Sequence, residues 1–217
     1  MSTLSTELSK HDDFSVTRND LTNDPCQRVT VIFARGTAEL GNVGALVGPP
    51  FFNALEVILG APDVAIQGVD YEADIAGYLA GGDAAGAADL ATKANLAASK
   101  CPNTQLVLSG YRYKVTLLFP HLGSQRYSNN HDSQGAQVVH LGANLLPAAT
   151  AARVKAVVVF GDPDRGQALQ AISADNVATY CFETDLICDG VPIVLPAHLA
   201  YAVDALPAAN FVVSKLS

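Results

Sequence analysis

Charged residues are scarce in this 217-residue sequence: Asp, Glu, Lys and Arg together make up 16%, against 49% hydrophobic residues. That balance excludes an intrinsically disordered chain, which would carry more charge and fewer apolar side chains. The length suits a single domain with a sizeable buried core. Positive charge is also in deficit, because the formal net charge is -8. An acidic surface repels phosphate backbones, so we expect no nucleic-acid partner.

Long apolar runs are absent as well. The longest, at 154–160 and 191–203, are short or interrupted by proline, so we expect no membrane span. The opening residues, MSTLSTELSKHDDFSVTRND, are polar and lack the apolar region of a signal peptide. We therefore expect a polar N-terminal segment at 1–25, followed by one domain at 26–217.

The sequence also lacks cysteine spacings that are typical of a metal site. The four cysteines, Cys26, Cys101, Cys181 and Cys188, contain no C-x-x-C pair, which argues against zinc. Two disulfides are the better interpretation, and they indicate an oxidising, extracellular compartment. Four cysteines allow three pairings, and the sequence alone does not choose among them.

Strand and helix patterns alternate along the chain. Short β-branched or apolar runs predict strands at 28–34, 64–69, 105–109 and 154–160, and helical composition is found at 51–60, 83–100 and 134–146. This alternation predicts a parallel sheet wrapped by helices.

Residues 112–132 fit neither pattern. Their sequence, RYKVTLLFPHLGSQRYSNNHD, is basic in an otherwise acidic, alanine-rich chain. A structureless connection of this length is unusual inside a compact domain. If the segment is removed, Tyr111 joins Ser133 and the chain reads Gly-Tyr-Ser-Gln-Gly, a G-x-S-x-G nucleophile elbow between a strand and a helix. A turn of this kind lifts the serine out of the sheet and points the first helical N–H groups at the developing oxyanion.

Two further residues complete a catalytic triad in the chain order of α/β-hydrolases, Ser, Asp, His. Asp185 lies between Cys181 and Cys188, and His198 follows in Leu-Pro-Ala-His-Leu-Ala-Tyr. His198 would take the proton of Ser133 while Asp185 fixes the histidine tautomer. Asp162, in a Gly-Asp-Pro turn, is a weaker competitor for the role of the acid. This chemistry needs no metal or organic cofactor.

Four features of the chain together resemble the fungal and bacterial cutinase family. They are Arg35-Gly36-Thr37 through Gly41-Asn42, the interrupted elbow, the CxxxDxxC loop around Asp185, and Pro196-Ala197-His198-Leu199. The resemblance covers nearly the whole chain from Cys26 onward. It implies an α/β-hydrolase with a small, doubly wound, mainly parallel five-stranded sheet and no large lid. It also implies disulfides Cys26–Cys101 and Cys181–Cys188.

The resemblance further assigns the oxyanion hole and the activity. The backbone N–H groups of Thr37 and Gln134 would form the hole, and the Thr37 hydroxyl would orient it. We expect a secreted, monomeric ester hydrolase that acts on cutin-type polyesters and short-chain esters. Two alternatives are a carbohydrate acetyl esterase of the same fold and a catalytically dead chain whose elbow is split.

The codons that could encode the two ends of 112–132 are compatible with splice sites. If Arg112 is encoded by AGG and Tyr113 begins with TA, a splice-donor pattern starts inside the Arg112 codon. If Ser133 is encoded by AGY, an acceptor ends inside that codon, and splicing would rebuild a serine codon directly after Tyr111. We therefore hypothesise that 112–132 is a translated, unspliced intron; the alternative is a genuine insertion.

Overall fold

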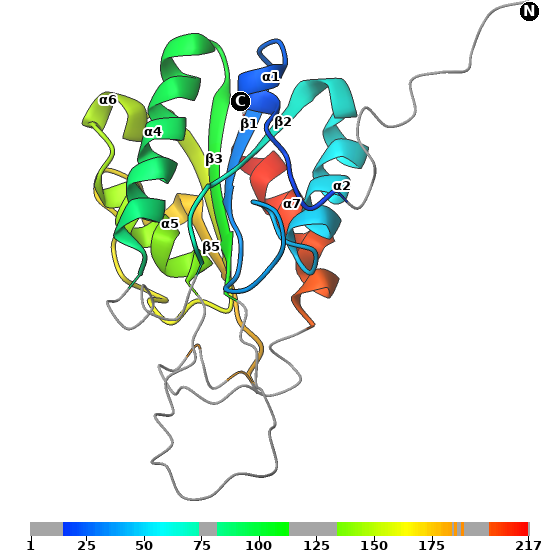
Figure 1. The fold of residues 1–217 in the computed structure, drawn as a ribbon, viewed down its shortest axis with the longest axis vertical. Helices are drawn as coiled ribbons and strands as arrows, with labels where there is room; N and C mark the ends of the chain where they lie inside the picture. The colour runs from blue at the N-terminus through cyan, green and yellow to red at the C-terminus, as the bar shows by residue number, and fades with distance from the viewer. Residues whose placement is uncertain are drawn as a thin grey trace, which may run out of the picture.

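The structure, a computed structural model, describes residues 15–73, 82–112, 134–183, 185, 188 and 200–216. Its strands form one parallel sheet in the order β2-β1-β3-β4-β5 (Figure 1). The strands are β1 Val29–Ala34, β2 Val64–Gly68, β3 Gln105–Tyr111, β4 Val154–Phe160 and β5 Val177–Tyr180. The chain moves outward from β1 to β2 and then returns to the other side of β1 as β3. Ligand sites of open α/β sheets form at the carboxyl ends of the strands beside such a reversal.

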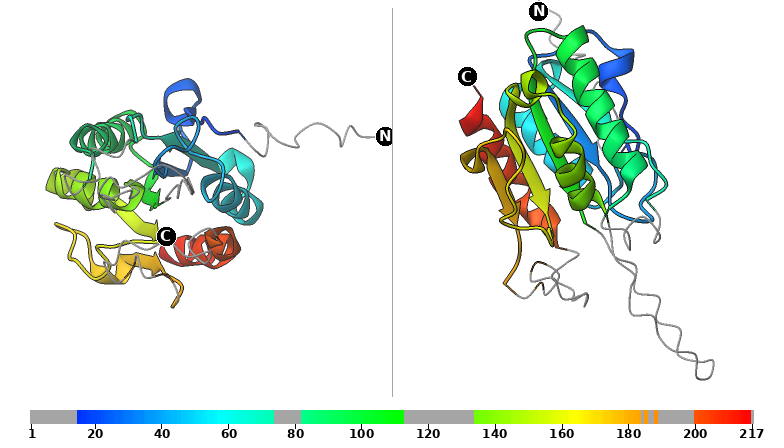
Figure 2. Two further views of the ribbon diagram at one scale, coloured as in Figure 1. Left: turned by 60° about the horizontal axis from the view of Figure 1, so that its bottom comes forward. Right: turned by 90° about the vertical axis from the view of Figure 1, so that its left-hand side faces the viewer.

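Helices cover both faces of this sheet, as Figure 2 shows. One face carries α4 (Ala84–Lys100) and α5 (Gly135–Asn144), and the other carries α2 (Gly48–Leu59) and α7 (Ala205–Lys215). Side chains of β1 alternate between the two layers, with Ile32 in the first core and Phe33 in the second. This arrangement confirms the predicted doubly wound α/β fold. The shorter elements are α1 Asp20–Asn23, η1 Ala61–Asp63, α6 Ala148–Ala151, η2 Ala174–Asn176 and η5 Tyr201–Asp204.

Local signals place the main helices close to their predicted positions. Asp83 caps α4 and accepts a hydrogen bond from the Gly86 N–H at 2.6 Å, as expected of an aspartate at this position. Helix α2 begins at Gly48, and Pro49 and Pro50 lie inside its first turn, where a missing N–H leaves no helical bond unmade.

The residues before Cys26 pack against the outer edge of β2. The Gly68 N–H donates to the Arg18 carbonyl at 2.9 Å, and the Ile66 N–H donates to the Asp20 carboxylate at 2.9 Å. Arg18 and Asp20 are buried and form an ion pair of 2.6 Å. The packed domain therefore includes residues 15–25, and this segment covers a sheet edge that would otherwise expose unpaired backbone groups.

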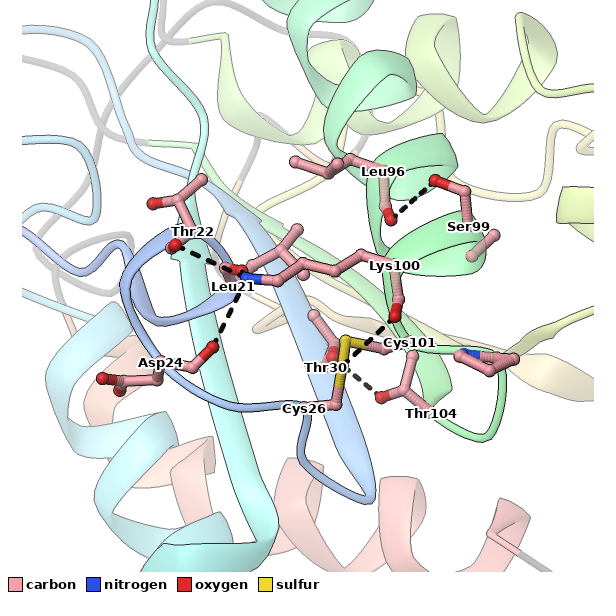
Figure 3. Close-up of a disulfide and its surroundings, with 12 residues drawn as sticks. Leu21, Thr22, Asp24, Cys26, Thr30, Leu96, Ser99, Lys100, Cys101 and Thr104 are labelled. Atoms are coloured by element: carbon pink, nitrogen blue, oxygen red, sulfur yellow. Dashed lines mark hydrogen bonds between the residues drawn. A yellow bond between two sulfur atoms is a disulfide. The ribbon is translucent and has the colours of Figure 1, made fainter.

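Disulfides join Cys26 to Cys101 and Cys181 to Cys188, the pairing that the family resemblance implies. Figure 3 shows that the first bridge lies at the end of α4, beside Lys100. The Lys100 ammonium donates to the carbonyls of Leu21 (2.6 Å) and Thr22 (3.4 Å). A covalent and a polar tether therefore fasten the same N-terminal segment to the core. Across the described ranges, no helix is long and apolar enough to span a membrane.

Candidate active site

The two flanks of the split elbow meet in the structure. Strand β3 ends at Tyr111 and helix α5 begins at Gly135. A methyl group on Gly135 would overlap the backbone oxygen of Tyr111, and one on Gly110 would overlap the backbone oxygen of Gly135. Glycine is needed at both positions because strand and helix approach each other directly. The strand and the helix that flank the predicted elbow are therefore in contact on either side of the interruption.

Arg112, the first residue of the anomalous segment, is packed in the domain. Its N–H donates to the Phe160 carbonyl at 3.0 Å and continues the ladder between β3 and β4. Its side chain is buried. Burial raises the pKa of Asp164, and the charge of Arg112 offsets part of that rise. In this chain Arg112 thus follows Tyr111 at the place that an uninterrupted elbow would give to the serine.

The two predicted oxyanion residues lie on segments that contact each other. Thr37 follows β1 and is buried, and Gln134 is the buried N-cap residue of α5. Gly135, next to Gln134, lies so close to the end of β1 that an added methyl group would overlap the carbonyls of Ala34 and Arg35. The first N–H groups of a helix have no partner within the helix. The start of α5 can therefore contribute such groups beside the Thr37 loop.

The predicted acid, Asp185, is held on several sides. Its side chain is 1% exposed. Its N–H donates to the Phe182 carbonyl at 2.9 Å, and its carbonyl accepts from the Cys188 N–H at 3.1 Å. The Cys181–Cys188 bridge joins the chain on either side of Asp185. A buried, fixed carboxylate is what the orienting member of a triad requires.

Tyr201 is a site residue that the sequence patterns did not reveal. Its hydroxyl donates to the Asp185 carboxylate at 2.5 Å. Burial raises the pKa of Tyr201, and the bond to Asp185 raises it further, so the phenol stays protonated and remains a donor. Its ring stacks on Phe182 and also contacts Tyr111 at the end of β3, with centroids 4.8 and 6.1 Å apart. Tyr201 therefore links the acid loop to the strand that leads into the elbow. The one feature of the sequence that points to Tyr201 as a site residue is its position three residues after His198.

Asp162, the competing acid, is engaged elsewhere. One carboxylate oxygen lies 3.0 Å from Nε2 of His140 on α5, and the other accepts from the Asp164 N–H at 2.9 Å. Burial lowers the pKa of His140, but the hydrogen bond and charge of Asp162, with Asp164, outweigh it and raise the pKa overall. Asp162 thus joins the β4 turn to α5, which favours a structural role.

Ser133 and His198 lie outside the described residues. Of the predicted triad and oxyanion residues, the structure therefore places Asp185, Thr37 and Gln134. Within the described part of the chain, no group of three or more His, Cys, Asp or Glu side chains could hold a metal ion.

A doubly wound parallel sheet in which a strand and a helix meet through glycines at the point of reversal is the framework of an α/β-hydrolase. The family model described as Cutinase matches residues 25–117 and 132–216. The chain belongs to the cutinase family, and is by that membership a serine carboxylic ester hydrolase. The match passes over 118–131, inside the segment that interrupts the elbow.

Curated relatives and solved structures agree with this assignment. A cutinase of Botryotinia fuckeliana is 46% identical over 187 residues, which is 86% of this chain and 82% of the relative. A cutinase from Trichoderma reesei, solved in complex with a phosphonate inhibitor, superimposes with a TM-score of 0.78 at 40% identity, covering 94% of this chain and 81% of that one. An acetylxylan esterase shares the fold with a TM-score of 0.58 and 19% identity, covering 89% of this chain and all of that one.

Proposed function

We propose that this chain encodes a secreted esterase that cleaves cutin-type polyesters and short-chain esters through an acyl-enzyme on Ser133. One observation carries the proposal: the flanks of the elbow, Tyr111 and Gly135, contact each other beside the end of β1. Only a short link between them would hold a serine in a strained turn over the oxyanion loop. The two disulfides support an extracellular location.

The proposed reaction has two steps. The Ser133 hydroxyl attacks the ester carbonyl carbon while His198 accepts its proton, and the N–H groups of Thr37 and Gln134 bind the oxyanion. The carbonyl–oxygen bond then breaks, and the alcohol leaves with the proton from His198. Water, deprotonated by His198, then attacks the acyl carbon; the bond to the Ser133 oxygen breaks, and His198 returns the proton to that oxygen as the acid leaves. Asp185 stabilises the imidazolium at each stage, and Tyr201 fixes the Asp185 carboxylate.

The segment 112–132 determines whether the full chain can perform this reaction. Arg112 follows Tyr111 in the ladder, so Ser133 is not joined to the strand that should present it. We propose that 112–132 is a retained intron and that the functional enzyme lacks it. Sequencing of abundant, fully spliced transcript tests this origin, and codons for 112–132 in that transcript would identify a genuine insertion instead.

Hydrolysis of p-nitrophenyl butyrate tests the function. We call the chain without 112–132 the uninterrupted form and compare it with the full chain. Because misplacing a nucleophile by about 1 Å lowers a rate on the order of a hundredfold, we expect at least that advantage for the uninterrupted form. Ser133→Ala in the uninterrupted form is the control and should abolish turnover. Equal rates in the two forms, or activity that survives Ser133→Ala, would contradict the proposal.

A carbohydrate acetyl esterase is not favoured as the function. The acetylxylan esterase is similar at 19% identity, which shows a shared fold only, whereas the two cutinases are 46% and 40% identical to this chain over the aligned residues.

A further inference from the structure

Glu39, in the loop after β1, accepts three backbone hydrogen bonds with one carboxylate. Oε2 accepts from the Gly36 N–H at 2.8 Å, and Oε1 accepts from the Ala45 and Leu46 N–H groups at 3.0 Å each. Bonds from backbone N–H groups to a charged oxygen are stronger than bonds between neutral groups. The single side chain therefore fastens the first part of this loop to its last part.

The three amides that donate to Glu39 lie at the two ends of the loop between β1 and α2. Gly36 directly precedes Thr37, and Leu46 lies just ahead of α2. The loop also bends around the carboxylate at Gly44, whose φ is +69° and where an added methyl group would overlap the Glu39 carboxylate. Only glycine adopts this backbone conformation without strain while leaving room for the side chain. The loop is thus built around Glu39.

A second set of bonds holds the outer side of the same loop. Arg35 donates from Nε to the Glu39 carbonyl at 2.9 Å and from Nη2 to the Tyr71 carbonyl at 2.9 Å. The guanidinium also stacks over the Tyr71 ring at 5.0 Å, and the Tyr71 hydroxyl donates back to the Arg35 carbonyl. The backbone on either side of Thr37 is therefore held by side chains of fixed position.

The energetics favour a positioning role for Glu39 over a stabilising one. Burial raises the pKa of Glu39, and the three N–H donors with the Arg35 charge offset only part of the rise. A carboxylate in this state is less stable when ionised than it would be in water. It does, however, fix the backbone of Gly36 on one side of Thr37.

We propose that Glu39 is a positioning residue that holds the Thr37 N–H in place for the oxyanion of the transition state. The inference rests on the proposed function in that Thr37 is taken as an oxyanion donor. Glu39 does not touch the substrate; it acts through the Gly36–Thr37 backbone. Glu39→Gln keeps the shape but turns one acceptor into a donor, so at least one of the three N–H groups loses its bond.

The kinetic test compares Glu39→Gln with Glu72→Gln in both the full chain and the uninterrupted form. Glu72 is an exposed glutamate near the same loop, so its variant makes the same change of charge without these bonds. We expect Glu39→Gln to lower kcat by about ten- to a hundredfold, with KM within about twofold, because the bond that it weakens indirectly, from the Thr37 N–H to the oxyanion, is made only in the transition state. Glu72→Gln should change neither constant. Equal kcat values for the two variants in the uninterrupted form would overturn the proposal.

A spectroscopic arm keeps the test independent of esterase activity. In the full chain, the amide resonances of Gly36, Thr37, Ala45 and Leu46 should shift in Glu39→Gln and keep their positions in Glu72→Gln. Loss of hydrolysis in both wild-type forms would refute the proposed function alone, and these resonances would then decide the role of Glu39. If the Gly36 and Thr37 amides in Glu39→Gln match those in Glu72→Gln, Glu39 does not position this loop.

Discussion

Removal of the Cys26–Cys101 disulfide should destabilise the fold far more than its effect on the native contacts suggests. The bridge closes a chain segment with a sequence separation of 75. On the chain-entropy relation, a loop of that length restricts the unfolded chain by about 4.5 kcal/mol at 25 °C. The Cys181–Cys188 bridge, with a separation of 7, gives about 2.4 kcal/mol by the same relation.

The native state around the first bridge should survive its loss. Lys100 still reaches the carbonyls of Leu21 and Thr22, and Arg153 still donates to the Cys101 carbonyl at 2.9 Å. The loss of stability would therefore arise in the unfolded ensemble, which becomes more expanded without the cross-link.

Urea unfolding followed by circular dichroism measures this difference. The variants are Cys26→Ala/Cys101→Ala and Cys181→Ala/Cys188→Ala, each compared with the unaltered chain. We expect the first pair to lose more stability and to show a larger m-value, since more surface is exposed on unfolding. A greater loss for the second pair would refute the reasoning, because it would mean that local strain or packing outweighs loop length.

Three further predictions concern the site. Asp185→Asn in the uninterrupted form should lower kcat by about 10⁴-fold, whereas Asp162→Asn should destabilise the fold and spare turnover in p-nitrophenyl butyrate assays of the folded fraction; the reverse result would exchange the two roles. Tyr201→Phe should lower the free energy of unfolding by about 1.5–3 kcal/mol through loss of the bond to a buried carboxylate; an unchanged urea midpoint would contradict that. The pKa of His140 is raised in the fold, so its stabilisation is fully present below the unfolded-state pKa and disappears as pH rises through the folded value. His140→Gln should therefore lose more stability at pH 5.5 than at pH 9, and an equal loss at both would exclude the ion pair.

Much of the fold follows from local patterns that need no distant partner. The strand at 154–160 was predicted with its observed bounds because a continuous apolar run suits a strand covered on both faces. The start of α4 follows from Asp83, which directly precedes the helix and whose side chain accepts a hydrogen bond from the Gly86 N–H in the first turn. The elbow frame was predictable because Gly110 and Gly135 are needed for contact between a strand and a helix.

Other features depend on residues far apart in the chain. Strand β5 is four residues long and only half-buried, so its short run carries little hydrophobic signal. Arg18 is polar in sequence yet buried, because Asp20 and Glu56 satisfy its guanidinium. The contact between Tyr201 and Asp185 likewise arises from the fold of the acid loop. Patterns in the sequence assign residue types to elements, but they do not specify such pairings.

The contact between the two elbow flanks, Tyr111 and Gly135, means that an insertion between them should affect catalysis more than folding. Because these flanks contact each other, an insertion between them costs the fold a loop-closure term that grows by about 0.6 kcal/mol for each doubling of the insert length. Cellular quality control acts on the population of unfolded chain, so a chain carrying residues 112–132 would escape degradation almost as well as one without them. A retained segment at this position would then yield long-lived protein with the shape, antigenic surface and disulfides of the enzyme. We expect the same attachment points to accept a ligand-binding domain as an engineered switch, with an effect on turnover larger than the effect on the fold.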